Sequence, residues 1–350
     1  MTIRQLAGIA ALAMALPAQA GSLDANEQRM VEWIDAHTED AIALLEETVN
    51  ISSGTMNHDG VRKVGAVMQR ELDAIGLETE WIELPPEMQR AGHVFARKTS
   101  GTSKKFVLIG HLDTVFEADD DFQAFQRDGD TATGPGVEDM KGGNVVIVYA
   151  LKALQEIGAL DDIPVVVAYT GEEEKSGIPL SISRKDLVEA GKWADIGLGF
   201  ESAMTFDGHD WGTIARRSTS EWMLSVEGRQ AHSSGIFSDD VGAGAIFETA
   251  RILNSFYEEV RGEEHLTFNV GTIQAGTDVE YDDQQNRGTT FGKTNVVPRT
   301  AVVHGGIRTI SQEQLDRAQA KMKEIVAASL PHTKASIEFG VGYPPMFPSE

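Results

Sequence analysis

Residues 104–113, KKFVLIGHLD, hold a short apolar run that ends in polar side chains. Such a run is typical of a buried β-strand, and its end carries His111 and Asp113. In α/β proteins the functional residues gather at the carboxyl ends of the strands. This stretch therefore predicts a sheet and also the edge of that sheet at which a site lies.

The chain on either side of this strand predicts an α/β fold. IPVVVAYT at residues 163–170 and ADIGLGFES at residues 194–202 have the length of strands, and acidic residues follow or end them. Apolar residues recur at helical spacing in residues 26–49, 61–75 and 144–155. The order strand, helix, strand favours a mostly parallel sheet with helices on both faces.

A second pattern begins near residue 218. We expect strands at residues 218–229, 265–276 and 299–310, and helices at residues 241–257 and 312–328. This order of elements is that of a small α+β domain of the ferredoxin-like type.

The two patterns predict the domain boundaries. We expect a first domain at residues 21–217 and an inserted domain at residues 218–330. Residues 331–350 are expected to return to the first domain, and we expect the C-terminal part of that domain to be missing.

The first twenty residues, MTIRQLAGIAALAMALPAQA, are typical of a secretory signal peptide. They hold an early cation at Arg4, an apolar run at residues 6–16 and small residues before the expected cleavage point after Ala20. The apolar run is much shorter than the roughly 20 residues that a membrane span needs. We expect a periplasmic or secreted protein with no membrane association after cleavage.

The amino-acid composition limits the partners and the metal ligands that can be expected. The chain holds 54 acidic and 30 basic residues, and its formal net charge of -24 disfavours nucleic acid as a partner. It holds no cysteine, so thiolate metal sites are excluded and any metal must be bound by His, Asp or Glu.

The strand ends and one glycine-rich turn, GPGVEDMKGG at residues 134–143, carry such ligands. A lone His after a strand is more often structural, and a run of Glu is usually a solvated loop. The combination of one His with several carboxylates, however, suits a pair of divalent cations. His111 and Asp113 are two residues apart on an extended strand, so the carboxylate can orient the imidazole.

Four motifs, GHLDTV, GPGVEDMKGG, TGEEEK and GFES, occur in this order. They resemble the zinc exopeptidase superfamily, which includes glutamate carboxypeptidase, acetylornithine deacetylase, succinyl-diaminopimelate desuccinylase and aminoacylase. The resemblance extends from about residue 30 to the end of the chain, and the spelling of the motifs is closest to glutamate carboxypeptidase. It implies that the inserted domain is a lid that commonly also forms a homodimer.

The resemblance implies a site with two zinc ions. His111, Asp139 and Glu201 would hold one ion, and Asp139 would bridge to a second ion that Glu174 also binds. Relatives carry a final metal-binding His in a C-terminal segment that has no counterpart in this sequence. We therefore expect the second zinc site to be weakened.

The remaining motif residues would serve catalysis. By the resemblance, Glu173 is the general base and Asp113 lies behind His111, whereas Glu172 stands where relatives often carry Asp and has no assigned role. Water shared by two zinc ions loses a proton near neutral pH, and a neighbouring carboxylate can take that proton and pass it to the leaving amine.

The inserted domain supplies further matches. GRQAHSSG resembles the lid segment in which a His, here His232, stabilises the oxyanion. NVVP and GGIRTI place Asn295 and Arg308 where relatives bind the substrate carboxylate, a task suited to a guanidinium. The alternative for His232 and Arg308 is an ordinary place on the surface.

These observations favour a zinc metallohydrolase that acts on a small peptide or N-acyl amino acid. The leading hypothesis is a carboxypeptidase that removes a C-terminal residue, with glutamate as the first candidate. The alternatives are an N-acyl amino acid deacylase of the same superfamily and a truncated, non-catalytic binding or dimerisation module. An aminopeptidase with two metal ions is disfavoured by the inserted domain.

Overall fold

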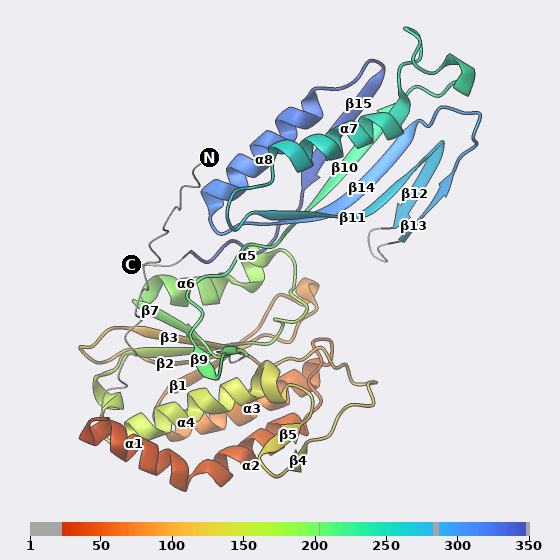
Figure 1. Ribbon diagram of the computed structural model, residues 1–350. Coiled ribbons are helices and arrows are strands. Elements are labelled where there is room, and N and C mark those ends of the chain that lie inside the picture. The colour runs from red at the N-terminus through yellow and green to blue at the C-terminus, as the bar shows by residue number, and fades with distance from the viewer. Residues whose placement is uncertain (1–22, 203, 283–286, 348–350) are drawn as a thin grey trace, which may run out of the picture. The chain divides into compact units, whose positions relative to one another are not determined.

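The structure is a computed structural model that describes residues 23–202, 204–282 and 287–347 (Figure 1). The predicted signal peptide, residues 1–20, lies outside the described residues. The chain divides into two compact units, Met1–Ala203 and Met204–Glu350. No helix in the described ranges is long and apolar enough to cross a membrane.

The first unit is built on a five-stranded sheet with the order β1-β2-β6-β3-β7. β3 pairs in parallel with β6 and β7, whereas β1 and β2 are antiparallel to their neighbours. The central β6 is buried along its whole length, as expected for a run of Val and Ala covered on both faces. The strands are β1 (Glu78–Ile82), β2 (His93–Lys98), β3 (Phe106–His111), β6 (Val165–Thr170) and β7 (Ile196–Gly199).

Helices cover both faces of this sheet, as predicted (Figure 1). On one face Leu108 of β3 belongs to the larger apolar cluster with residues of α2, α3 and α4. On the other face Val107 belongs to a smaller cluster with Ala190 of α6. The helices are α1 (Ala25–Ala36), α2 (Thr38–Val49), α3 (His58–Ala74), α4 (Gly143–Glu156), α5 (Leu180–Ser183) and α6 (Lys185–Trp193).

The second unit has the ferredoxin-like order strand, helix, strand, strand, helix, strand. Its antiparallel sheet has the order β11-β14-β10-β15, and residues of α7 and α8 share one apolar core with it. The elements are β10 (Ser220–Gly228), α7 (Gly244–Glu259), β11 (Thr267–Gly276), β14 (Thr300–Arg308), α8 (Gln312–Ala327) and β15 (Thr333–Phe339).

The expected return of residues 331–350 to the first domain is wrong for β15. This strand pairs with β10 along its length, from Trp222 opposite Phe339 to Gly228 opposite Thr333. Alternate side chains of β15, among them Ile337, pack on the core beneath the helices. The strand therefore completes the second unit's sheet.

Short hairpins complete the two units. One lies in the first unit, one directly follows residue 203, and one joins β11 to β14. Their strands are β4 (Gln126–Asp128), β5 (Thr131–Thr133), β8 (Met204–Phe206), β9 (His209–Trp211), β12 (Asp278–Asp282) and β13 (Arg287–Phe291). The hairpin β8-β9 belongs to the second unit, so the division between the units falls before the predicted residue 218.

Candidate metal centre

Three parallel strands bring the predicted ligands to one edge of the first unit's sheet. β3 ends at His111 and lies between β6 and β7. β6 ends at Thr170, shortly before residues 172–174, and β7 ends at Gly199, two residues before Glu201. Because the carboxyl ends of parallel strands share an edge, acidic residues from separate parts of the sequence meet there.

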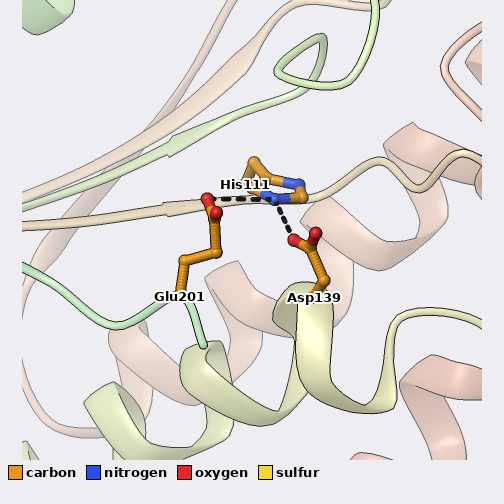
Figure 2. Close-up of side chains that lie close together, drawn as sticks. All are labelled: His111, Asp139 and Glu201. Carbon is orange, nitrogen blue, oxygen red and sulfur yellow. Dashed lines mark hydrogen bonds and ion pairs between the residues drawn. The ribbon is translucent and has the colours of Figure 1, made fainter. Parts of the chain in front are cut away.

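The buried imidazole of His111 is the centre of this group. Its Nε2 atom lies 2.9 Å from Oδ1 of Asp139 and 3.9 Å from Oε2 of Glu201. Figure 2 shows both carboxylates directed at this nitrogen. The three ligand atoms lie within 4.8 Å of one another and form a possible metal-binding group.

The chemistry of this group fits a divalent cation. Burial lowers the pKa of His111, but hydrogen bonds with Asp113 and Asp139 outweigh burial and raise the pKa to about 10. Carboxylates that hold a proton so firmly also favour a metal ion in its place, and His with Asp and Glu is a ligand set for such an ion.

The carboxylate of Asp113 ties the centre together. It is fully buried, and it accepts hydrogen bonds from Oγ1 of Thr55 at 2.7 Å, the N–H of Glu173 at 3.0 Å and the N–H of Glu174 at 3.1 Å. Nδ1 of His111 lies 3.0 Å from the backbone oxygen of Asp113 and 3.4 Å from its Oδ1. The backbone carbonyl and the carboxylate of Asp113 thus both orient the imidazole, which leaves Nε2 for a metal.

These contacts also set the charge of Asp113. Burial raises the pKa of its carboxyl, but the hydrogen bond and positive charge of His111, with hydrogen bonds from Thr55 and Glu173, lower the pKa overall. Thr55 could not be recognised as a site residue from the sequence, because it lies 58 residues before Asp113 in a loop with no recognisable pattern.

Asp139 is held by a tight turn within Val137–Gly142, where its own backbone leaves the helical conformation. The Asp139–Met140 peptide is cis. The next residue beyond this turn, Gly143, closely approaches the segment that carries Glu201. A Cβ atom at Gly143 would lie 2.1 Å from the carbonyl oxygen of Phe200, so only glycine fits there.

The three consecutive glutamates have different surroundings. Glu172 is fully buried and contacts Arg184 rather than the imidazole. Burial raises the pKa of Glu173, and burial followed by the charge of Asp139 raises the pKa of Glu174 to about 7. Glu174 lies outside the three-residue group around His111, but it is close enough to Asp139 to interact with its charge.

The predicted lid residues lie in the second unit. His232 and Asn295 are exposed and near each other, because His232 bridges to Val296 and the N–H of Ser233 donates to the carbonyl of Asn295 at 2.9 Å. Nδ1 of His232 also lies 2.8 Å from Oγ of Ser234.

Arg308 is at the other end of the second unit's sheet. β14 runs from Thr300, near the segment of His232, to Arg308, which is exposed. Eight residue steps at about 3.4 Å each separate these ends by roughly 27 Å. Arg308 thus lies far along β14 from the end that is near the segment of His232.

Known proteins resemble this chain in sequence and in fold. Residues 214–334 match the peptidase dimerisation domain family. Carboxypeptidase G2 from Pseudomonas sp. (strain RS-16) is 27% identical over 290 residues, which are 81% of this chain and 63% of that protein. The resemblance to the zinc exopeptidase superfamily is confirmed. The chain spans 63% of the length of this curated relative.

Solved structures of the superfamily share the fold. Aminopeptidase PepT from Bacillus cereus matches with a TM-score of 0.65 and 18% identity, over 92% of this chain and 78% of that one. A dinuclear metal binding peptidase of the M20 family from Bacillus subtilis matches with a TM-score of 0.56 and 14% identity, over 89% of this chain and 76% of that one. The mixed α/β unit with a dimerisation domain is thus a fold of this superfamily.

Proposed function

We propose that this chain is a zinc metallohydrolase that cleaves an amide bond of a peptide or an N-acyl amino acid. Removal of a C-terminal residue, with glutamate as the first candidate, is the form that the motif spelling and the likeness to a carboxypeptidase support best. The proposal rests on one observation: His111, Asp139 and Glu201 lie together at the edge of the sheet where the carboxyl ends of three parallel strands meet.

The proposed ligands are those of a two-zinc site. His111, Asp139 and Glu201 would hold one ion, and Asp139 and Glu174 would contribute to the other. Zinc ions bound there would supply a water molecule whose pKa is lowered to near neutrality. Burial and, after it, the negative charge of Asp139 raise the pKa of Glu174, which supports its place beside Asp139 at a site that a cation would neutralise.

Glu173 is the proposed general base. Its carboxyl is partly buried, which raises its pKa, and its backbone N–H is fixed on Asp113. A base whose pKa lies above that of an ordinary carboxyl accepts a proton from the attacking water more readily. The Glu173 carboxyl would then return this proton to the nitrogen of the leaving amine.

We also propose a homodimer formed through the second unit. The match to a dimerisation domain supports it, and so does the separation of Arg308 from His232 along β14. If both side chains contact one substrate, they come from different copies of the chain.

Residues 1–20 support export to the periplasm or the medium, which amino-terminal sequencing of the exported protein would test.

The decisive assay compares dipeptides and folate-like substrates with N-acetyl amino acids, with and without a chelator. We expect the chelator to abolish hydrolysis, and Glu173→Gln to lower the rate by about 10² to 10⁴. Glu156→Gln, at an exposed position near the end of α4, is the matched control and should leave the rate unchanged. Preference for N-acetyl amino acids would instead identify a deacylase. Absence of any hydrolysis by the metal-loaded protein would favour the non-catalytic module.

A further inference from the structure

Glu172 is a fully buried acid that has no place among the proposed metal ligands. Its Oε1 atom contacts Nη1 of Arg184, and its Oε2 atom accepts the N–H of Gly177. Arg184 makes two more hydrogen bonds, from Nη2 to Oγ of Ser176 at 2.6 Å and to the carbonyl of Glu172 at 3.4 Å. The carboxylate of Glu172 thus closes the loop of residues 172–177 through Gly177 and joins this loop to Arg184.

His93 of β2 fastens the same segment at both ends. Nδ1 of its imidazole accepts the N–H of Gly171 at 3.2 Å, and Nε2 lies 3.0 Å from the carbonyl of Ser183 and must donate to it. Gly171 directly precedes Glu172, and Ser183 directly precedes Arg184. The ion pair is therefore held at a fixed distance from the sheet.

The closed loop fixes the orientation of Glu173 and Glu174, the two residues that follow Glu172. The backbone N–H groups of Glu173 and Glu174 both donate to the carboxylate of Asp113, which also contacts His111. A continuous series of contacts thus leads from Arg184 through Glu172 and Asp113 to the imidazole of His111. If the loop turned differently at Glu172, both N–H groups would leave Asp113.

Stability alone gives a poor account of this ion pair. Taking two charges out of water is costly, and a well-packed apolar pair of similar volume is often as stable. A buried carboxylate with contacts at both oxygens does, however, fix a loop in one conformation. Because the carboxylate of Glu172 already pairs with Arg184, it would not compete with Glu174 for a metal ion.

We propose that the ion pair of Glu172 and Arg184, named here the carboxylate clamp, positions Glu173 and Glu174 for the metal ions and the attacking water. The proposal rests on the proposed function, because the two glutamates need their exact orientation only if they act as base and ligand. Arg184 is a positioning residue in this scheme and does not touch the substrate.

The test compares Arg184→Met and Arg184→Lys with the control Lys185→Met. Lys185 is the next residue, is exposed, and pairs with Glu189 on the surface of α6 at 3.9 Å. Three quantities are measured on the full chain: amide hydrogen exchange of the peptide covering residues 171–177 without metal, zinc affinity by competition with a chelating dye, and kcat with KM.

We expect Arg184→Met to lower zinc affinity and kcat by about 10- to 100-fold, as removal of groups that support metal ligands commonly does. KM should stay within about threefold, because the substrate contacts are kept. Exchange in residues 171–177 should accelerate while exchange in α8 is unchanged. Arg184→Lys should lie between wild type and Arg184→Met, since one ammonium reaches fewer partners than a guanidinium.

Two outcomes overturn the clamp. If Arg184→Met lowers the unfolding temperature but leaves loop exchange and zinc affinity at the wild-type values, the ion pair is only structural. If the wild-type chain neither binds zinc nor hydrolyses any substrate, the proposed function fails and the clamp fails with it. Should Arg184→Met not fold, Arg184→Lys and Glu172→Gln, which keeps the side-chain shape, must show the same losses in smaller degree.

Discussion

The hydroxyl of Thr55 lies 2.7 Å from Oδ2 of Asp113, and the carboxylate that it contacts is fully buried. This contact joins a loop near the amino terminus to the end of β3. A hydrogen bond to a buried charged group contributes about 1.5 to 3 kcal/mol. We expect Thr55→Val, which keeps the shape and removes the donor, to lower the free energy of unfolding of the metal-free chain by that amount.

The matched control for Thr55 is Thr48→Val. Thr48 is also fully buried, but its hydroxyl donates to backbone carbonyls within α2, those of Leu44 and Leu45, rather than to a carboxylate. Loss of such a local bond should change the free energy of unfolding by less than about 1 kcal/mol. Equal losses in the two variants, measured by denaturant titration, would show that the bond to Asp113 has no special value.

The contact of Thr55 with Asp113 could not be predicted from the sequence, whereas the motif residues of the site could. The residues in motifs at strand ends could be predicted, because parallel strands bring their carboxyl ends together by geometry alone. Thr55 and Arg184 could not, because each reaches its partner through a loop whose path depends on tertiary packing. Neither residue differs locally from the many surface Thr and Arg residues of a globular protein.

Gly143 is predicted to be irreplaceable, because a Cβ atom there would lie 2.1 Å from the carbonyl oxygen of Phe200. Gly143→Ala must push apart the turn of Asp139 and the segment of Glu201. We expect a loss of about 1 to 3 kcal/mol in the free energy of unfolding, and a fall in zinc affinity of at least about tenfold.

Gly191→Ala is the control for Gly143→Ala. Gly191 lies in α6, and beyond the neighbouring backbone of its own helix no atom of the described residues lies within 4 Å of the position where its Cβ would be. Alanine favours the helix over glycine, so this change should raise the free energy of unfolding by about 0.5 to 1 kcal/mol. A comparable loss in both variants, in thermal or denaturant unfolding, would contradict the close approach at Gly143.

The buried His93 should make the chain sensitive to acid. Burial lowers its pKa, the carbonyl of Ser183 and the charge of Asp186 oppose this shift, and the charge of Arg184 adds to it. Protonation would also break the hydrogen bond that Nδ1 accepts from Gly171. Below the unfolded-state pKa of about 6.5 the unfolded chain binds the proton more readily, so acid favours unfolding.

The contribution of His93 is therefore fully present above about pH 6.5 and is lost as the pH falls toward the lower pKa of the folded state. One such group gives a slope of at most about 1.4 kcal/mol per pH unit. We expect His93→Gln to flatten the fall in the free energy of unfolding between about pH 7 and 5. His265→Gln, which removes an exposed imidazole, should keep the wild-type slope. An unchanged slope in His93→Gln would exclude His93 as the cause.

The fold of the second unit shows a different limit. The strand, helix, strand, strand, helix order predicts a ferredoxin-like domain, but the sequence alone places the fourth strand with the other domain. The alternation of Ala335, Ile337 and Phe339 indicates one buried face in β15, and either sheet could accept such a strand. β15 joins the second unit because it pairs with the edge of β10. Which strand offers a free edge is known only once the sheet is assembled, so the sequence of β15 cannot show it.

The separation of His232 from Arg308 along β14 gives a prediction about the proposed homodimer. If one substrate is held by both side chains, each site takes them from different copies. His232→Ala and Arg308→Ala should each be inactive alone. Co-expressed, they should regain about one quarter of the wild-type activity, because half of the dimers are mixed and each mixed dimer has one intact site.

Co-expression of Glu173→Gln with Asp139→Asn is the control. Both changes lie in the first unit and, in the proposed scheme, serve the same site of one chain, so mixed dimers gain no intact site. Failure of the first pair to recover any activity would mean that the two side chains do not meet across copies.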